Sequence, residues 1–183
     1  MVFLRVMSIF NRSFCFMKVL TALVLFFFFE QNNVYAQNYQ TYTLYMHGFT
    51  KYVVWPEEDK KGDFEIFVLG ESALIAELQK MAEKKKVGDR TIKIFKLNTL
   101  KEFQKGHILF VPVEQSGLLP EVLNKIGDRS TLLITEQPGL GLKGSDINFI
   151  TKGGKLAFEL NQSALSKHKL KAASELTRLA IVI

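Results

Sequence analysis

The chain has 183 residues, with 24 Lys and Arg against 18 Asp and Glu and a single cysteine, Cys15. Its basic residues are scattered rather than arranged in a stripe with interleaved aromatic residues, so nucleic acid is not expected as a partner. Cys15 lies within an N-terminal sorting signal, which excludes disulfides, a thiolate nucleophile and sulfur metal ligands from the mature domain.

The sorting signal is expected over residues 1–36, and residues 17–36 alone have the three-part order of a secretory signal peptide. A basic start is followed by an apolar run over residues 19–29, and the segment ends in Val34-Tyr35-Ala36. The apolar run has 11 residues, whereas a membrane-spanning helix needs about 20. We therefore expect cleavage after Ala36 and export to the periplasm, with a retained membrane anchor as the alternative.

Cleavage after Ala36 divides the chain into a signal peptide over residues 1–36 and a mature domain over residues 37–183. The mature domain has 147 residues, with 21 Lys and Arg against 17 Asp and Glu. This length fits one domain that can bury a core without disulfides, and no membrane span is expected after processing. Met1, Met7 and Met17 all remain possible starts, because the basic-then-apolar pattern is complete from Met17 alone.

The first mature element is predicted to be a helix that ends at Trp55-Pro56, because a proline disfavours the helical conformation of the residue before it. Its aromatic stripe favours burial in the core over a ligand platform, since apolar residues at helical spacing usually face the core. The stripe consists of Tyr42, Tyr45, Met46, Phe49, Tyr52 and Val53.

Strands and helices then alternate along the chain, which predicts right-handed crossovers and a parallel sheet covered by helices on both faces. Ser72 and Ser116 are the expected caps of two of these helices. The segment over residues 107–113 is almost continuously apolar, as in a central strand. The predicted strands cover residues 64–70, 91–97, 107–113 and 131–135. The predicted helices follow Ser72 and Ser116, with a short helix over residues 100–103.

The end of the chain departs from this alternation. Two predicted strands, over residues 147–151 and 155–160, flank Gly153-Gly154, which is a hairpin signal. Asn161 can cap a short helix or serve as a glycosylation acceptor, and the cap is favoured; a final helix is expected over residues 170–180. The fold class is α/β: a single-domain, Rossmann-like three-layer sandwich with a mostly parallel sheet and a C-terminal antiparallel hairpin.

The segment Gly139–Gly144 matches the pattern G-x-G-x-x-G, which binds dinucleotides where a helix follows it. Here the following residues read as a strand, so no dinucleotide and no other cofactor is expected. The glycines are interpreted as a sharp surface loop. That loop would carry Leu140 and Leu142 as apolar residues that could meet a partner, with packing of both leucines back onto the core as the alternative.

Other candidate chemistry is sparse. His47, His107 and His168 lie in separate predicted elements without metal-ligand spacing, so no metal site and no catalytic site are expected. The triplet Lys84-Lys85-Lys86 either forms an anion or membrane patch or follows the preference of cations for a helix C-terminus, which is favoured.

Several ordered motifs resemble those of the YfiR family of periplasmic proteins, over nearly the whole mature chain. The residues similar to the family are Phe49–Pro56 with its Trp-Pro exit, Phe67–Gly70, His107–Val111, Pro138-Gly139 with Gly144, Ile147–Phe149, Phe158–Asn161 and Leu176–Ala180. The resemblance implies a non-enzymatic regulator that holds down the periplasmic domain of an inner-membrane diguanylate cyclase, which lowers cyclic-di-GMP and biofilm formation. A sensor histidine kinase is the alternative partner, and its periplasmic domain would be held down in the same way.

The chain departs from the best-known members in lacking cysteine pairs. The resemblance therefore does not imply that this chain is regulated by cysteine oxidation. The resemblance also points to the Pro-Gly loop and the terminal hairpin as the partner-binding surface, with Leu140, Leu142, Phe149 and Lys152 as candidates. For Phe149 burial is at least as well supported as exposure. A periplasmic small-ligand-binding protein with a polar pocket near Trp55 is the alternative function, and self-association into a homo-oligomer remains open.

Overall fold

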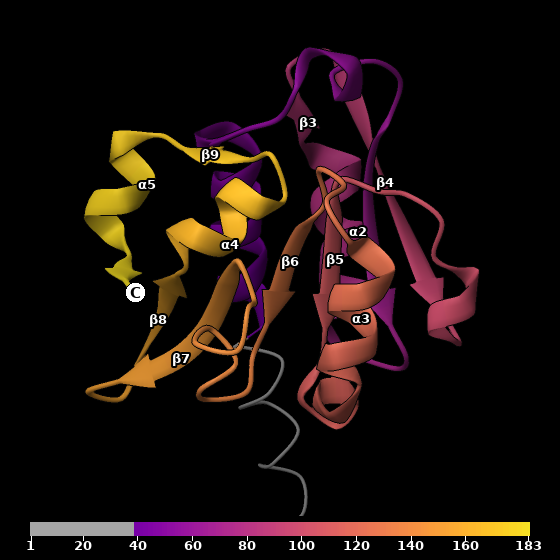
Figure 1. Cartoon of the computed structure of the whole chain (residues 1–183). Coiled ribbons are helices and arrows are strands. Elements are labelled where there is room, and N and C mark those ends of the chain that lie inside the picture. Colours follow the sequence, from indigo (N-terminus) through magenta and orange to yellow (C-terminus); the bar gives the residue numbers. More distant parts are fainter. Residues whose placement is uncertain (1–38) are drawn as a thin grey trace, which may run out of the picture. The chain divides into compact units, whose positions relative to one another are not determined.

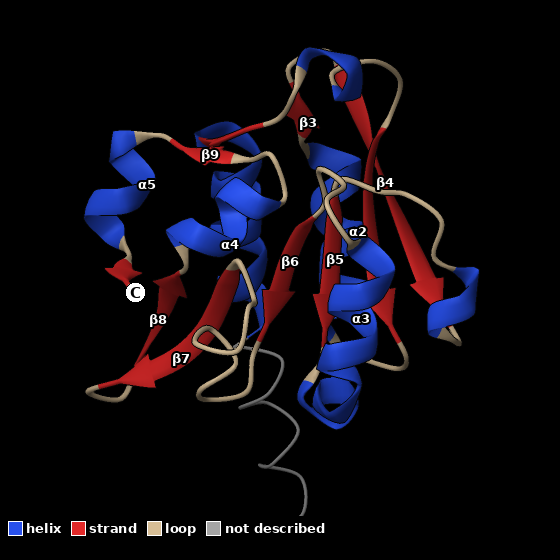
Figure 2. Cartoon of the chain, in the orientation of Figure 1, coloured by secondary structure: helices blue, strands red, loops and turns tan. Residues whose placement is uncertain are grey.

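An eight-stranded sheet forms the centre of the computed structural model, which describes residues 39–183 (Figures 1 and 2). The predicted signal peptide and its expected cleavage site lie outside these residues. The strand order is β10-β8-β7-β6-β5-β2-β4-β3. In that order the strands are Ile181–Val182, Lys155–Leu160, Ile147–Lys152, Leu132–Thr135, Ile108–Val111, Phe64–Leu69, Arg90–Leu97 and Lys86–Val87.

The centre of the sheet is parallel, as predicted. β2 pairs in parallel with both β4 and β5, and β6 pairs in parallel with β5 and β7. β7 and β8 form the expected antiparallel hairpin, in which Lys152 lies opposite Lys155 across the Gly-Gly turn. Every residue of β5 and β6 is buried, which is typical of strands covered on both faces. The α/β class with its C-terminal hairpin is therefore confirmed.

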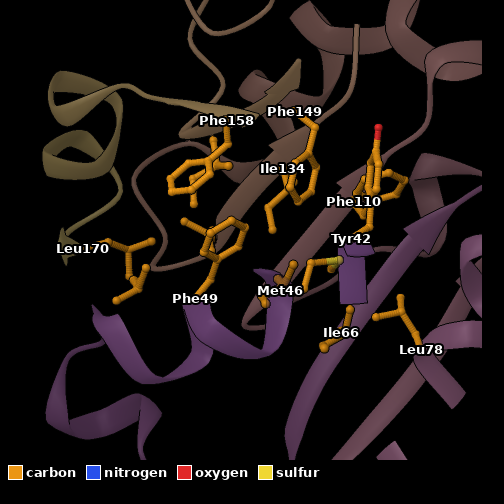
Figure 3. Packing of buried hydrophobic residues seen from close by; sticks show 14 of the residues in the cluster. Tyr42, Met46, Phe49, Ile66, Leu78, Phe110, Ile134, Phe149, Phe158 and Leu170 are labelled. Carbon is orange, nitrogen blue, oxygen red and sulfur yellow. The ribbon is translucent and has the colours of Figure 1, made fainter. Parts of the chain in front are cut away.

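Helices cover the two faces of the sheet and enclose two hydrophobic cores. A helix that includes residues 39–52 packs on one face together with α2 (Leu74–Lys84), and α3 (Leu119–Ile126) packs on the other. The alternation along β2 illustrates the division, since Ile66 faces the first core and Leu69 the second. Figure 3 shows Met46 and Phe49 from the helix of residues 39–52 against the side chains of the sheet.

Two of the predicted helix caps are confirmed in detail. The Ser72 Oγ atom accepts a hydrogen bond from the backbone N–H of Leu74 at 3.2 Å, at the start of α2. The Asn161 side chain accepts one from the N–H of Ala164 at 2.9 Å, at the start of α4 (Gln162–Lys167). The cap at Ser116 is wrong. This residue lies in the 3-10 helix η3 (Val113–Leu118) and donates to the Val113 carbonyl, while α3 begins only at Leu119.

The final helix is shorter than predicted. Residues 170–180 form the short strand β9 (Lys171–Ala172) and then α5 (Ser174–Leu179), before β10 ends the sheet. β9 pairs antiparallel with β1 (Val53–Val54) directly after the helix of residues 39–52. Backbone hydrogen bonding to this distant segment outweighs the local helical spacing, a competition that periodicity cannot reveal.

Two further 3-10 helices, η1 (Glu57–Asp59) and η2 (Leu100–Glu102), lie in the loops that precede β2 and β5. Within residues 39–183, no helix combines the length and apolar character that crossing a membrane would require.

Candidate partner-binding surface

The Gly-rich loop between β6 and β7 turns one of its two leucines into the core. Leu140 is only 3% exposed and packs in the second core with residues of α3, whereas Leu142 is 76% exposed. The Leu140 carbonyl accepts hydrogen bonds from the N–H groups of Lys143 and Ser145, both at 3.1 Å. These bonds close a tight turn around the buried leucine. The expectation that Leu140 is exposed is therefore wrong, because the turn directs its side chain inward.

The two remaining candidate residues also differ in burial. Phe149 is fully buried, and its ring centroid lies 4.2 Å from that of Tyr42 and 5.8 Å from that of Phe49. Lys152 is exposed at the end of β7. Of the four candidates, the fold thus leaves Leu142 and Lys152 at the surface. Their contact with a partner stays a prediction.

The glycines of the loop serve close packing and backbone turns. A Cβ atom on Gly141 would lie 2.6 Å from the Glu159 Oε2 atom, so a larger residue there would have to displace the end of the Glu159 side chain. Gly144 has a φ of +111°, a conformation that side chains disfavour. The segment that follows is strand β7, as expected. The helix N-terminus that a dinucleotide phosphate requires does not follow these glycines.

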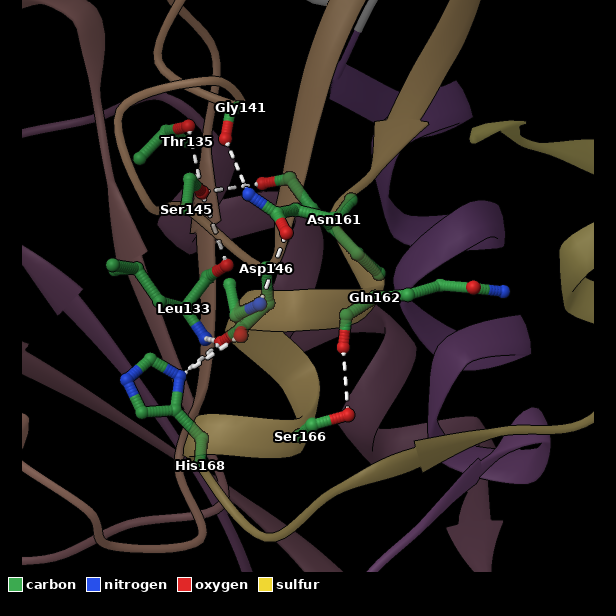
Figure 4. Close-up of polar contacts among 11 residues, drawn as sticks. Leu133, Thr135, Gly141, Ser145, Asp146, Asn161, Gln162, Ser166 and His168 are labelled. Atoms are coloured by element: carbon green, nitrogen blue, oxygen red, sulfur yellow. Dashed lines mark hydrogen bonds and ion pairs between the residues drawn. The ribbon is translucent and has the colours of Figure 1, made fainter. Parts of the chain in front are cut away.

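A buried contact between Asp146 and His168 lies beside the loop (Figure 4). The His168 Nδ1 atom lies 2.8 Å from the Asp146 Oδ1 atom, and Asp146 Oδ2 accepts a hydrogen bond from the Leu133 N–H at 2.6 Å. Burial raises the pKa of the Asp146 carboxyl, although His168 opposes the shift. Both side chains are completely buried, so the pair ties the end of α4 to β6 rather than meeting a solute.

A second polar cluster surrounds His107, directly before the N-terminal end of the central strand β5. The His107 Nδ1 atom lies 3.1 Å from the Glu65 N–H, which makes it the acceptor, and Nε2 lies 2.8 Å from the Asp59 carbonyl oxygen. The ring stacks on Phe64, with centroids 4.5 Å apart, and lies 6.3 Å from the Trp55 ring. Burial lowers the pKa of His107. The neutral imidazole is the form that this environment favours.

A polar pocket of about 230 Å³ opens beside His107. Asp59 lies in its wall and accepts from Ser130 and Lys105. Burial alone would raise the pKa of Asp59, but these two hydrogen bonds and the positive charge of Lys105 lower it overall. The other lining residues include both signs of charge: Glu58, Lys61, Asp63 and Glu65. Within the described part of the chain, no three His, Cys, Asp or Glu side chains gather where they could hold a metal ion.

An apolar groove, which we call the helix groove, lies between the helix of residues 39–52 and α5. Its volume is about 370 Å³. Leu44 on one wall is 72% exposed and Leu179 on the other is 69% exposed, which is unusual for leucine side chains facing a common hollow. The lining residues are Thr41, Leu44, Tyr45, Gly48, Phe49, Tyr52, Phe158, Leu176 and Leu179.

A cleft lined by basic side chains, which we call the lysine patch, lies on the neighbouring side of the same helix. His47 and Lys51 of the helix meet the end of α2 and the start of β3 there. Its lysines are Lys51, Lys84, Lys85 and Lys86, and all four are exposed. Burial, and then the charge of Lys51, lower the pKa of His47. The patch therefore includes the lysine triplet, of which Lys86 begins β3 instead of ending the helix.

Sequence reasoning missed the helix groove, and it named the lysine triplet as a possible anion or membrane patch but favoured a helix C-terminus. The aromatic stripe was correctly expected to face the core for Tyr42, Met46 and Phe49. Leu44 lies outside that stripe on the helix. An apolar residue away from the core-facing side was the one sequence signal that could have indicated an exposed apolar surface. The other wall could not be foreseen, because Leu179 was expected to be buried in a longer helix.

Comparison with known proteins supports the family resemblance. A family model described as YfiR/HmsC-like matches residues 39–181, which is nearly all of the part that the structure describes. A search of curated proteins finds no match.

Proposed function

Because the chain belongs to the YfiR/HmsC-like family, we propose that it is a periplasmic, non-enzymatic regulator that binds and represses the sensor domain of an inner-membrane signalling protein. Proteins of this family are periplasmic regulators of signalling proteins. The partner would be the periplasmic domain of a diguanylate cyclase or of a sensor histidine kinase.

The helix groove is the observation that carries this proposal. Exposed leucines on two walls of one apolar hollow cost free energy in water, and such a surface is typical of a protein that binds another. The groove is also lined by the half-buried Tyr45 and by Tyr52, which is 37% exposed, and tyrosine is a residue type on which binding energy often concentrates. The Asp146–His168 contact is fully buried and the pocket beside His107 is polar, so neither supplies a comparable apolar surface.

Repression follows if the regulator binds the inactive conformation of its partner more tightly than the active one. A ligand shifts an equilibrium only by its difference in affinity for the two states. A preference of about 100-fold, equivalent to about 2.7 kcal/mol, would change an evenly populated sensor to one that is almost entirely inactive. Loss of the regulator from the complex would then restore signalling.

The direct test is binding between the mature chain and the periplasmic domain of the membrane-bound cyclase or kinase encoded beside it. Saturable binding in a titration, together with lower cyclic-di-GMP or lower kinase phosphorylation in cells, supports the proposal. The absence of binding to that domain, with unchanged signalling after deletion of this chain, would reject it.

The polar pocket beside His107 supports a second candidate function, the binding of a small polar molecule. Its lining offers Lys61 and Lys105 together with several carboxylates, an arrangement suited to a zwitterion of a few heavy atoms. A thermal-shift screen against free amino acids and sugars tests this function. Stabilisation that Lys105→Ala abolishes would support it, and no shift from any compound would count against it.

A further inference from the structure

The helix groove and the lysine patch are neighbours on one helix and form a single two-part surface. Leu44 and Gly48 line the groove, and His47 and Lys51 line the patch. Residues three and four apart are adjacent on a helix surface, so Leu44 lies next to His47 and Gly48 next to Lys51. We propose that this surface binds an acidic amphipathic helix of the partner, an inference that rests on the proposed function.

The apolar part sets the length of the bound segment. The groove follows the helix from Thr41 to Tyr52, which at 1.5 Å per residue is about 17 Å, or about three helical turns. Gly48 leaves the middle of the groove open, because a Cβ atom built there would have no heavy atom within 4 Å. An apolar side chain of the partner can enter at this point.

The lining of the groove favours a helix over an extended strand. Eight of the nine lining residues come from the two helices, and only Phe158 comes from a strand. The surface therefore presents side chains instead of free backbone N–H and C=O groups. A bound segment must satisfy its own backbone hydrogen bonds, which an amphipathic helix does when its apolar face lies in a groove.

The lysine patch determines the charge of the bound segment. Its four lysines are accompanied by one carboxylate, Glu83. Among residues 39–183, no carboxylate lies within ion-pair distance of any of these four ammonium groups, and the lysines that form ion pairs lie elsewhere. Carboxylates along one side of a helix in the groove would meet this uncompensated charge. Charge complementarity of this kind speeds association and selects the partner.

The same charge argues against a second copy of the chain as the occupant. A two-fold contact would place the same surface on both subunits. Each lysine patch would then either face the equally basic patch of the other subunit or lie outside the contact. Like charges brought together across an interface weaken it. A partner with the opposite charge avoids this cost.

The first experiment uses designed peptides and does not depend on the identity of the partner. A helix of about 14 residues carries leucines spaced three and four apart and glutamates along one side, and a twin carries lysines in place of the glutamates. We expect the acidic peptide to bind the mature chain at least about tenfold more tightly than the basic twin in fluorescence anisotropy. This preference should diminish between about 0.05 M and about 0.5 M salt, because salt screens exposed charges.

Two variants separate the parts of the surface, and each has a matched control. Gly48→Leu fills the groove, and Gly117→Leu makes the same change in η3, where the built Cβ also has no close neighbour. The double variant Lys84→Glu with Lys85→Glu reverses charge in the patch. Lys101→Glu is its single-site control beyond the other end of β4. We expect each surface variant to weaken binding of the acidic peptide at least about tenfold and each control to leave it unchanged.

Folding is checked independently, because Gly48 occupies a helix interior where leucine is the better helix former. Gly48→Leu should therefore melt no lower than the unmodified chain. If Gly48→Leu melts lower, loss of binding by the folded lysine variant alone still decides whether the patch is used.

Each of the following results would overturn the inference. Equal binding of the acidic and basic peptides, or equal binding by the surface variants and their controls, would exclude this surface. Binding to vesicles of phosphatidylethanolamine and phosphatidylglycerol that the same variants abolish, without peptide binding, would assign the surface to a membrane. Self-association that Gly48→Leu abolishes would assign it to a second copy. If the full sensor domain binds but the variants do not weaken it, the regulator function stands and this inference fails.

Discussion

The His168 Nδ1 atom lies 2.8 Å from the Asp146 Oδ1 atom, and both side chains are completely buried although they are 22 residues apart in the chain. The second oxygen of Asp146 accepts from the Leu133 backbone. One carboxylate therefore joins the end of α4, the loop before β7 and strand β6. This contact holds the end of α4 against the sheet.

Removal of Asp146 should strongly destabilise the fold. Asp146→Ala leaves both His168 and the Leu133 N–H without their partner, and we expect a loss of about 3–5 kcal/mol in the free energy of unfolding, measured in urea. Asp128→Ala is the control, because it breaks an ion pair with Lys169 at the exposed surface. A similar small effect of both substitutions would show that the buried pair contributes little.

Stability should fall when the pH is lowered below neutrality. Burial lowers the pKa of His107, and of His47, in the folded chain, so the unfolded chain binds more protons as the pH decreases. The stability that these two histidines contribute is fully present above the pKa of histidine in the unfolded chain, about 6.5. It is lost as the pH falls towards their lower pKa values in the folded chain. Thermal melts between about pH 7.5 and about pH 5 measure this slope. Replacement of both histidines by glutamine should flatten it, and an unchanged slope in that variant would refute the assignment.

The two loop leucines should respond differently to the same substitution. Leu140→Asp places a charge in the second core and should lower the free energy of unfolding by more than about 2 kcal/mol. Leu142→Asp changes an exposed side chain and should have an effect within about 0.5 kcal/mol. Urea unfolding of the two variants provides the measurement. Weaker binding of the sensor domain by Leu142→Asp or Lys152→Glu would identify the Gly-rich loop and hairpin as a contact, while unchanged binding would remove them from the interface.

Processing should occur after Ala36, because Val34-Tyr35-Ala36 precedes the polar pair Gln37-Asn38. Intact-mass analysis of the exported protein should give a chain that begins at Gln37. A full-length chain recovered with the membrane fraction would instead support a retained anchor.

The helical and strand segments were largely predictable because the signals that specify them are local. The Gly-Gly pair at 153–154 gave the β7–β8 hairpin, Asn161 gave the start of α4, and the apolar run at 107–113 gave the buried strand β5. In each case the residues that determine the conformation are neighbours in the chain. Local chemistry failed where a distant segment competed, as when β9 paired with β1 inside the expected final helix.

The sequence alone therefore determined the α/β class, the hairpin and the family resemblance, since period and turn chemistry act over a few residues. Only the tertiary structure decided that Leu140 faces inward while Leu142 faces outward, and that Asp146 meets His168. It also brought Leu179 opposite Leu44 and the lysine triplet beside Lys51. Each of these relationships joins segments distant in the chain, and their positions depend on how helices and strands pack rather than on the residues beside them.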